Sequence, residues 1–183
     1  MCAETTAQAM EDRVIMPRNE ERQTVCVYAY LSDMPVLDRS YSAFAQKDWA
    51  TMAACYHPDA QFSDPVFPQL DAAHVRAMWK MLLNNDSPMH VTHHIVEENV
   101  TIGACDWEAR YTFSSTGRPV HNIIHSEFKF RDGLIFRQRD QFGFWRWSKQ
   151  ALGTSGLLLG WTHVVRNKVR ATAARRLAKV MQG

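Results

Sequence analysis

The spacing of apolar and polar residues changes character once along the chain. From Val36 to about residue 83, apolar residues recur three and four positions apart, which is the spacing of one helix face. This pattern predicts three helices, over 36–45, 49–56 and 72–83, with a short strand from Ala60 to Asp64 before the third. Asp48 and Asp71 stand where the N-caps of the second and third helices are expected.

After the loop at 84–88 the period becomes two, which is typical of half-buried strands. Residues 91–104 predict one or two strands broken near Glu98, and further strands are predicted over 105–113, 119–130 and 134–142, with a hairpin turn at Asp132-Gly133. Helices followed by an antiparallel meander predict an α+β domain, whose sheet buries one face against the N-terminal helices.

Two segments lie outside this domain, which spans 36–152 and closes with a helix over 144–152. Residues 1–35 lack sustained periodicity and are interpreted as a flexible N-terminal arm. Residues 153–183 are predicted to form a basic, helical C-terminal extension. The apolar side of its helix, over 163–181, carries Val165, Val169, Ala173, Leu177 and Met181.

Composition narrows the class of protein. The chain has 183 residues, 46% of them hydrophobic and 22% charged, which suits one globular domain with short extensions. Its four Cys residues form no CxxC pair, which argues against a disulfide framework or a zinc ribbon. No apolar run reaches the length of a membrane span, and the N-terminus is too polar for a signal peptide. We therefore expect a cytoplasmic protein.

Positive charge is concentrated at the C-terminus. Eight of the 21 Lys and Arg residues follow Asp140, and none of the 19 Asp and Glu residues does. The basic helix is expected to dock on the chain's own acidic body, although its apolar side also permits contact with a membrane surface. No nucleic-acid-binding module is present, so no nucleic-acid partner is expected.

Two aspartates on apolar strand faces are the candidate catalytic acids. Asp140 shares its face of the last strand with Leu134, Phe136, Gln138 and Phe142, and Asp64 shares a face with Phe62. Burial raises the pKa of a carboxyl, which suits proton transfer.

Each candidate also has a structural interpretation. Asp64 precedes Pro65, so it is also suited to capping a turn. Asp140 can pair with Arg137, Arg139 or Arg146, and Tyr41 can be a core tyrosine with one hydrogen bond.

The strand over 119–130 supplies candidate ligand-binding groups. Asn122 and Ser126 lie on its more apolar face, whereas His121 and His125 lie on the opposite face, where a structural or interfacial role is expected. His90, His93 and His94 have no Asp, Glu or Cys partners at metal-ligand spacing, and no nucleotide-binding motif is present, so no metal or cofactor is expected. The residues expected to line a substrate pocket are Asn122, Ser126, Phe62, Trp79, Phe128 and Phe142.

The order of elements over 36–152 resembles the nuclear transport factor 2-like superfamily, the cone fold shared by ketosteroid isomerases, SnoaL-like polyketide cyclases and limonene epoxide hydrolases. Tyr41, followed by the D-A-x-x-x-D-P segment from Asp59 to Pro65, resembles the ketosteroid isomerase pattern. The resemblance implies a cone-shaped, curved antiparallel sheet and a homodimer. It also implies that Asp64 is the general base and Tyr41 the oxyanion donor, with Ser126 in the place of the family's second donor, a protonated Asp.

Two further stretches extend the resemblance. Arg139-Asp140-Gln141-Phe142 resembles the R-D-x-F of the last strand of epoxide hydrolases and cyclases, in which the Asp is catalytic. The segments at 144–147, 150–153 and 157–161 resemble bacterial SnoaL-like proteins that carry a C-terminal helical extension.

The first functional hypothesis is a cofactor-independent isomerase or cyclase for a small hydrophobic carbonyl compound. Asp64 or Asp140 would remove a proton next to the carbonyl, and Tyr41 would stabilise the enolate oxygen with help from Asn122 or Ser126. The alternatives are a non-catalytic ligand-binding or dimerising module and an epoxide hydrolase-like enzyme that uses Asp140. The three candidate catalytic groups should converge on one point if the protein is an enzyme.

Overall fold

The computed structural model describes residues 34–84 and 87–182. The predicted N-terminal arm, residues 1–35, therefore lies almost entirely outside the described residues. Residues 35–183 form one compact unit. The C-terminal extension belongs to the same unit as the domain.

Three helices form where the helical spacing predicts them: α2 (Val36–Ala45), α3 (Trp49–Ala54) and α4 (Ala72–Leu83). The Asp48 carboxylate accepts a hydrogen bond from the Thr51 amide at 3.0 Å and caps α3. The Asp71 carboxylate caps α4 in the same way, by accepting from the His74 amide at 3.0 Å.

The second helix is shorter than predicted, and the strand that follows it is longer. Strand β1 (Tyr56–Ser63) begins directly after Cys55 and includes His57-Pro58, whereas the sequence pattern placed its start at Ala60. Tyr56 is 2% exposed and its hydroxyl forms buried hydrogen bonds with Trp79 and Gln138. These tertiary contacts outweigh the local helical spacing.

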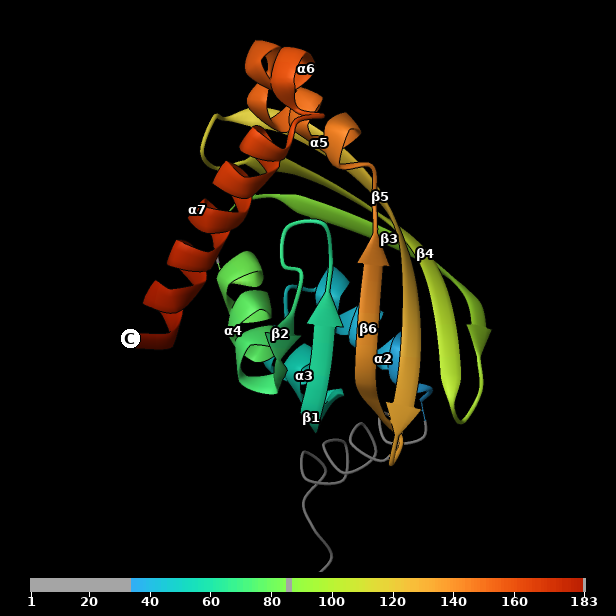
Figure 1. Cartoon of the computed structure of the whole chain (residues 1–183). Helices are drawn as coiled ribbons and strands as arrows, with labels where there is room; N and C mark the ends of the chain where they lie inside the picture. Colours follow the sequence, from blue (N-terminus) through green and yellow to red (C-terminus); the bar gives the residue numbers. More distant parts are fainter. Residues whose placement is uncertain (1–33, 85–86, 183) are drawn as a thin grey trace, which may run out of the picture. The chain divides into compact units, whose positions relative to one another are not determined.

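The sheet is curved and unclosed, and with its covering helices it forms the predicted α+β fold (Figure 1). All neighbouring strands are antiparallel except β1 and β6, which run parallel. This pair differs from the expectation of a wholly antiparallel sheet. In spatial order the strands are β2 (Leu70–Asp71), β1, β6 (Leu134–Gln141), β5 (Arg118–Arg131), β4 (Ile102–Phe113) and β3 (Met89–Glu98).

A bulge near the start of β6 corrects the predicted face of that strand. Lys129 pairs with Arg137 and Phe130 pairs with Ile135, so Phe136 is left as the extra residue. Ile135 is fully buried, whereas the Phe136 ring lies under the Arg131 guanidinium at 3.6 Å and against the His57 ring. Leu134 and Phe136 therefore do not share the alternation that brings Gln138 and Asp140 to the inner face.

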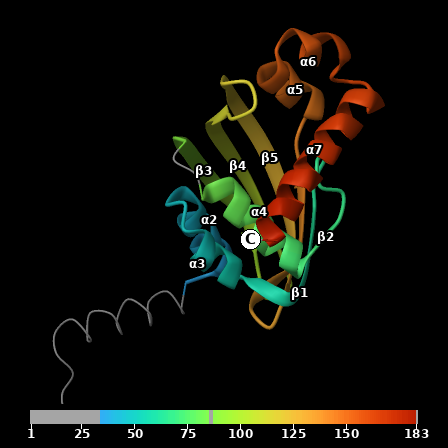
Figure 2. The same cartoon turned by 90° about the vertical axis from the view of Figure 1, so that its left-hand side faces the viewer.

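The inner face of the sheet packs on α2, α3 and α4 (Figure 2). Aromatic rings dominate this core: the Phe44 ring lies 5.2 Å from the Trp79 ring and 5.2 Å from the Trp107 ring. The alternation predicted for β5 is confirmed. Val120, Ser126 and Phe128 are buried, whereas the residues that flank Ser126 and Phe128 along the strand are exposed.

The C-terminal extension consists of α6 (Thr154–Leu159) and α7 (His163–Gln182), which follow the predicted closing helix α5 (Phe144–Leu152). Helix α7 lies beside α4 (Figure 2), and it buries Leu177 in the main core. Ala173 packs on the same core, whereas Met181, predicted on the same side, is 42% exposed. No helix of the described residues has the length and apolarity that crossing a membrane requires.

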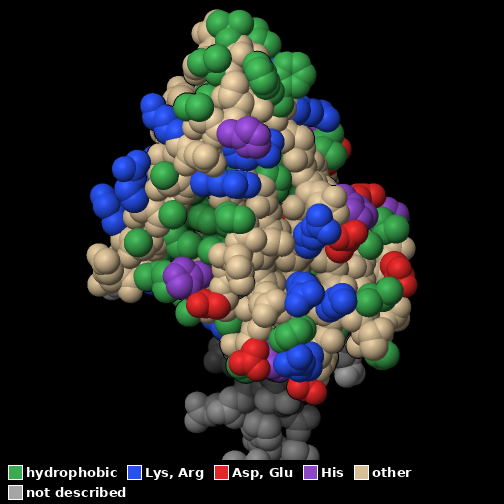
Figure 3. Space-filling view, viewed as in Figure 1, with side chains coloured by type: hydrophobic (Ala, Val, Ile, Leu, Met, Phe, Trp, Pro, Cys, Tyr) green, Lys and Arg blue, Asp and Glu red, His purple; other side chains and the backbone are tan. Residues whose placement is uncertain are grey.

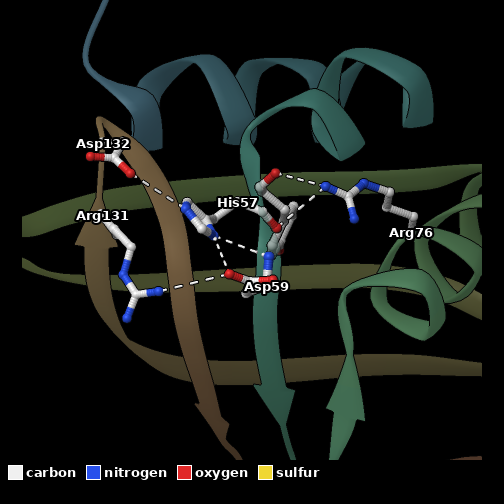
Figure 4. Close-up of polar contacts among 6 residues, drawn as sticks. His57, Asp59, Arg76, Arg131 and Asp132 are labelled. Carbon is white, nitrogen blue, oxygen red and sulfur yellow. Dashed lines mark hydrogen bonds and ion pairs between the residues drawn. The ribbon is translucent and has the colours of Figure 1, made fainter.

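A polar cluster joins the start of β1 to its neighbours (Figure 4). The Arg76 guanidinium of α4 donates to the Tyr56 carbonyl at 2.8 Å and to the His57 carbonyl at 3.3 Å. The His57 ring lies 3.5 Å from the Asp132 carboxylate and accepts from the Asp59 amide at 3.0 Å. Both carboxylates of the cluster are exposed, so these contacts tie α4 and the β5–β6 turn to β1.

Candidate active site

Asp140 is the most deeply placed charged residue of the candidate site. It stands on β6 directly opposite Ser126 of β5, and both side chains are buried on the inner face. The Ser126 hydroxyl donates to Asp140 Oδ1 at 2.6 Å, and the Gln138 amide donates to the same oxygen at 2.8 Å. One carboxylate oxygen thus accepts two hydrogen bonds.

Two chains of hydrogen bonds end at this oxygen. In the first, Trp107 Nε1 donates to the Ser126 hydroxyl at 2.8 Å. In the second, Trp79 Nε1 donates to the Tyr56 hydroxyl at 2.9 Å, and that hydroxyl donates to Gln138 Oε1.

The starting groups fix the direction of both chains. An indole N–H can only donate, so the hydroxyl that accepts from it passes its own hydrogen onward. Asp140 Oδ1 is the terminal acceptor, and a proton bound to Asp140 must therefore sit on Oδ2.

The electrostatics of Asp140 favour a carboxyl that holds its proton near neutral pH. Burial raises its pKa to about 7, against the lowering effect of the hydrogen bonds from Ser126 and Gln138, and the charge of Asp64 adds to the rise. The structural alternative for Asp140, a pairing with Arg137, Arg139 or Arg146, is not found: Arg137 donates to Gln61, Arg139 lies 3.9 Å from Glu127, and no cation of the described residues pairs with Asp140.

Tyr41 reaches the same region from α2. Its ring stacks on His93 at 5.0 Å and meets Phe128 edge-on at 6.4 Å. Its hydroxyl is buried beside Ser126 and Cys105 but has no hydrogen-bond partner within the described residues, so the expected single hydrogen bond is absent. Burial, followed by the charge of Asp140, holds the pKa of Tyr41 well above its usual value. A buried hydroxyl without a partner is rare in folded proteins.

Asp64 follows the end of β1 and caps the turn after it. Its Oδ1 accepts from the Val66 amide at 2.6 Å and from the Phe67 amide, which confirms the turn-capping interpretation. Burial raises the pKa of Asp64 to about 6, and the two amides and the Arg170 charge act against this rise. Arg170 of α7 also donates to the Pro65 carbonyl at 3.0 Å, so the C-terminal helix contacts this turn.

Tyr41 and Asp140 both lie beside Ser126, whereas Asp64 lies in the turn after β1. The charge of Asp64 raises the pKa of Asp140, and that of Asp140 raises the pKa of Tyr41, so the three groups are coupled electrostatically. Of the predicted lining residues, Phe62, Trp79 and Phe128 are buried in the same core, with the Phe62 ring edge-on to Trp79 at 6.1 Å. Phe142 and Asn122 are half-buried.

The sequence pattern assigns no functional role to Tyr56 and Trp107, and it places Gln138 on an apolar strand face without a function. The alternation along β4 and β6 signals that Trp107 and Gln138 face inward. Their joint orientation toward Asp140 depends on strand pairing that a single sequence does not specify. The two outer-face histidines are paired: His121 lies 2.6 Å from Glu108 and His125 lies 2.6 Å from Asp106.

Two surface hollows lie away from these groups. The larger, of about 710 Å³, runs along β3 beside the start of α2, and the smaller, of about 440 Å³, is lined by Tyr111, Val120 and Gln150 among others. Neither is lined by Asp64, Tyr41 or Asp140. The Tyr41 and Asp140 side chains are buried, and Asp64 is half-buried. In the described part of the chain no three His, Cys, Asp or Glu side chains are placed to hold a metal ion.

The curved sheet on its helices is the fold of the nuclear transport factor 2-like superfamily. A family model described as the SnoaL-like domain matches residues 37–138, and the chain belongs to this family. A search of curated proteins finds no match.

Solved structures share the fold at low sequence identity. A proposed polyketide cyclase from Silicibacter is 21% identical over 66% of this chain and 93% of its own, with a TM-score of 0.56. A proposed isomerase from Bacillus subtilis is 19% identical over 64% of this chain and 90% of its own, with a TM-score of 0.54. An epoxide hydrolase from M. tuberculosis is 16% identical over 71% of this chain and 92% of its own, with a TM-score of 0.50. At these identities the likeness establishes the fold, which hosts several chemistries.

Proposed function

We propose that this protein is a cofactor-independent proton-transfer enzyme of the isomerase or cyclase kind, acting on a small hydrophobic carbonyl compound. The observation that carries the proposal is the unpartnered Tyr41 hydroxyl, buried beside Ser126, whose own hydroxyl donates to a carboxyl with a pKa raised to about 7. Family membership and the names of the similar structures, a cyclase and an isomerase, agree with this reaction class.

The surroundings of the two carboxyls divide the roles between them: Asp64 is half-buried at a turn, whereas Asp140 is buried and accepts two hydrogen bonds on Oδ1. With a pKa of about 6, Asp64 is mostly ionised at neutral pH and serves as the base. Its Oδ1 is held by backbone amides, so the other oxygen takes the proton from the carbon next to the carbonyl.

Asp140 then acts as a hydrogen-bond donor to the enolate oxygen, together with Tyr41. With a pKa of about 7 it is partly protonated at neutral pH, and the two converging hydrogen-bond chains leave that proton on Oδ2. The ketosteroid isomerase pattern has a protonated Asp on the long strand; here that strand carries Ser126, which hydrogen-bonds the carboxyl of the next strand instead.

A positioned base contributes about 10² to 10⁴-fold to the rate, and one oxyanion donor on the order of 10² to 10³-fold. Together these two effects are enough for enolisation without a metal or nucleotide.

The test combines ligand binding with hydrogen exchange. Steroid, terpenoid and polyketide-like carbonyl compounds are screened for ligands that raise the melting temperature. Each ligand is then incubated with the protein in D₂O, and exchange of the hydrogens next to its carbonyl is followed by NMR. Wild type should accelerate exchange, Asp64→Asn should slow it by about 10²-fold or more, and Glu127→Gln, an exposed control on the outer face of β5, should leave it unchanged.

A non-catalytic binding module is the second candidate function. It is favoured by the position of the two hollows, which lie away from the carboxyls. Ligands that stabilise the protein but show no accelerated exchange would establish this alternative. An epoxide hydrolase-like use of Asp140 has less support, because Arg110, the nearest candidate cation on β4, lies exposed beside Glu108 at 3.3 Å.

A further inference from the structure

The hairpin formed by α5 and α6 has its small residues inside and its large apolar residues outside. A Cβ atom added at Gly156 would lie 1.9 Å from the Ser148 carbonyl oxygen, and one added at Gly160 would lie 1.9 Å from the Ser148 hydroxyl. Only glycine fits at both positions, so the close packing of α6 on α5 uses no large side chain. The three leucines between these glycines therefore face away from the hairpin.

The outward side chains form one apolar patch at the end of the domain. Figure 3 shows this patch as a group of hydrophobic side chains at the top of the molecule, over α6. We call it the apolar tip, and its members, with their exposed fractions, are Trp145 (47%), Leu157 (49%), Leu158 (66%), Leu159 (52%), Trp161 (67%) and Val164 (77%). Exposed apolar residues are normally scattered, and clusters of this kind mark interaction surfaces.

The charged residues near the apolar tip in the sequence are all basic. The Lys149 ammonium lies 4.4 Å from the centre of the Trp145 ring. Arg146 directly follows Trp145 in the sequence, and Arg166 and Lys168 come shortly after Val164. No Asp or Glu occurs after Asp140. In Figure 3 the basic side chains lie directly beneath the apolar group.

The two tryptophans of the tip satisfy their N–H groups locally. Trp145 Nε1 donates to the Leu157 carbonyl at 3.2 Å, and Trp161 Nε1 donates to the Leu158 carbonyl at 3.1 Å. The two indole rings can therefore be transferred from water to an apolar environment while keeping these hydrogen bonds. Exposed Leu and Trp beside Lys and Arg is the composition of segments that lie in the headgroup region of a membrane.

We propose that the apolar tip inserts into the surface of a bilayer containing anionic phospholipids, with the neighbouring cations at the lipid phosphates. A second copy of the chain fits this surface less well. Two tips in symmetric contact would bring their cations together without any acidic residue to offset the repulsion. The inference is independent of the proposed enzymatic function, because no residue of the candidate active site takes part.

The test measures sedimentation of the full-length protein with vesicles. Wild type should bind vesicles of equimolar phosphatidylglycerol and phosphatidylcholine at 50 mM salt. It should bind vesicles of phosphatidylcholine alone about tenfold less, and 0.5 M salt should weaken binding to the anionic vesicles. Leu158→Asp should lower binding about tenfold or more, because it places a charge where an apolar side chain enters the membrane.

Val100→Asp provides the matched control, since Val100 is 91% exposed in the turn between β3 and β4 and lies outside the tip. It should bind vesicles like wild type, and both variants should keep the wild-type melting temperature. Equal binding by the two variants, or no binding by wild type, would overturn the proposal. The proposal would also be overturned if wild type were a dimer in solution, Leu158→Asp were a monomer, and neither protein bound vesicles. The apolar tip would then be the contact between two copies of the chain.

Discussion

At the scale of single residues, two tyrosine hydroxyls in the same core differ in one respect. The Tyr56 hydroxyl accepts from Trp79 and donates to Gln138, whereas the Tyr41 hydroxyl has no partner in the described residues. An unpartnered buried hydroxyl does not stabilise the fold, and its presence there needs another explanation. Donation to a ligand is that explanation under the proposed function.

The first prediction compares the two hydroxyls. Tyr41→Phe should leave the free energy of unfolding unchanged or raise it, because no hydrogen bond is lost and a buried polar group is removed. Tyr56→Phe should lower it by about 1 to 3 kcal/mol, because Trp79 and Gln138 then lose their partner. Urea unfolding of both variants measures the difference. An equal loss in both would show that the Tyr41 hydroxyl is satisfied in solution.

The residues of the site differ in how far sequence could predict them. Asp64, Tyr41 and Asp140 are identified by their position on apolar faces and by resemblance, and the alternation on β5 predicts the inward position of Ser126. A period of two does not reveal the bulge at Phe136, so the pattern predicts the wrong face for the start of β6. The hydrogen-bond chains through Tyr56 and Trp107 depend on register between distant strands, which a single sequence does not contain.

At the scale of secondary-structure elements, helix α7 is part of the domain's core rather than an appendage. Leu177 is 3% exposed and packs in the main cluster, and Arg176 donates to the Ser114 and Ser115 hydroxyls at 3.3 and 2.8 Å. Because Arg170 contacts the turn that holds Asp64, the same helix also borders the candidate site.

The second prediction concerns this packing. Leu177→Ala should lower the free energy of unfolding by about 2 to 5 kcal/mol, the usual range for removing a buried leucine. Met181→Ala, on the same helix but 42% exposed, is the control and should have a much smaller effect. Chemical denaturation of both proteins gives the comparison. A small effect at both positions would mean that α7 detaches readily from the domain.

The third prediction concerns the hairpin of α5 and α6. Gly160→Ala should destabilise it, because the added methyl group would overlap the Ser148 hydroxyl. Gly143→Ala should be tolerated, since the nearest heavy atom to its added Cβ, Arg146 Cβ, would lie 3.4 Å away. Limited proteolysis near residues 153–162 reports on the hairpin. Identical cleavage rates in the two variants would contradict the close packing.

At the scale of the whole molecule, two buried carboxyls make stability depend on pH. The pKa of Asp140 is raised to about 7 and that of Asp64 to about 6, whereas an aspartate in the unfolded chain has a pKa of about 4. Between about pH 4 and pH 7 the folded protein therefore binds more protons than the unfolded chain. The stability that these groups contribute is fully present below about pH 4 and is lost as the pH rises through 6 and 7.

The fourth prediction isolates the share of Asp140. In Asp140→Asn the amide oxygen can still accept from Ser126 and Gln138, so the variant should fold, but it no longer has to ionise in a buried position. Relative to wild type, the variant should gain stability on the order of a few kcal/mol as the pH rises from 5 to 8. Urea unfolding across this pH range measures the difference, with Glu127→Gln as the exposed control. Parallel curves for wild type and Asp140→Asn would mean that Asp140 ionises freely, and the proposed donor to the enolate oxygen would then be Tyr41 alone.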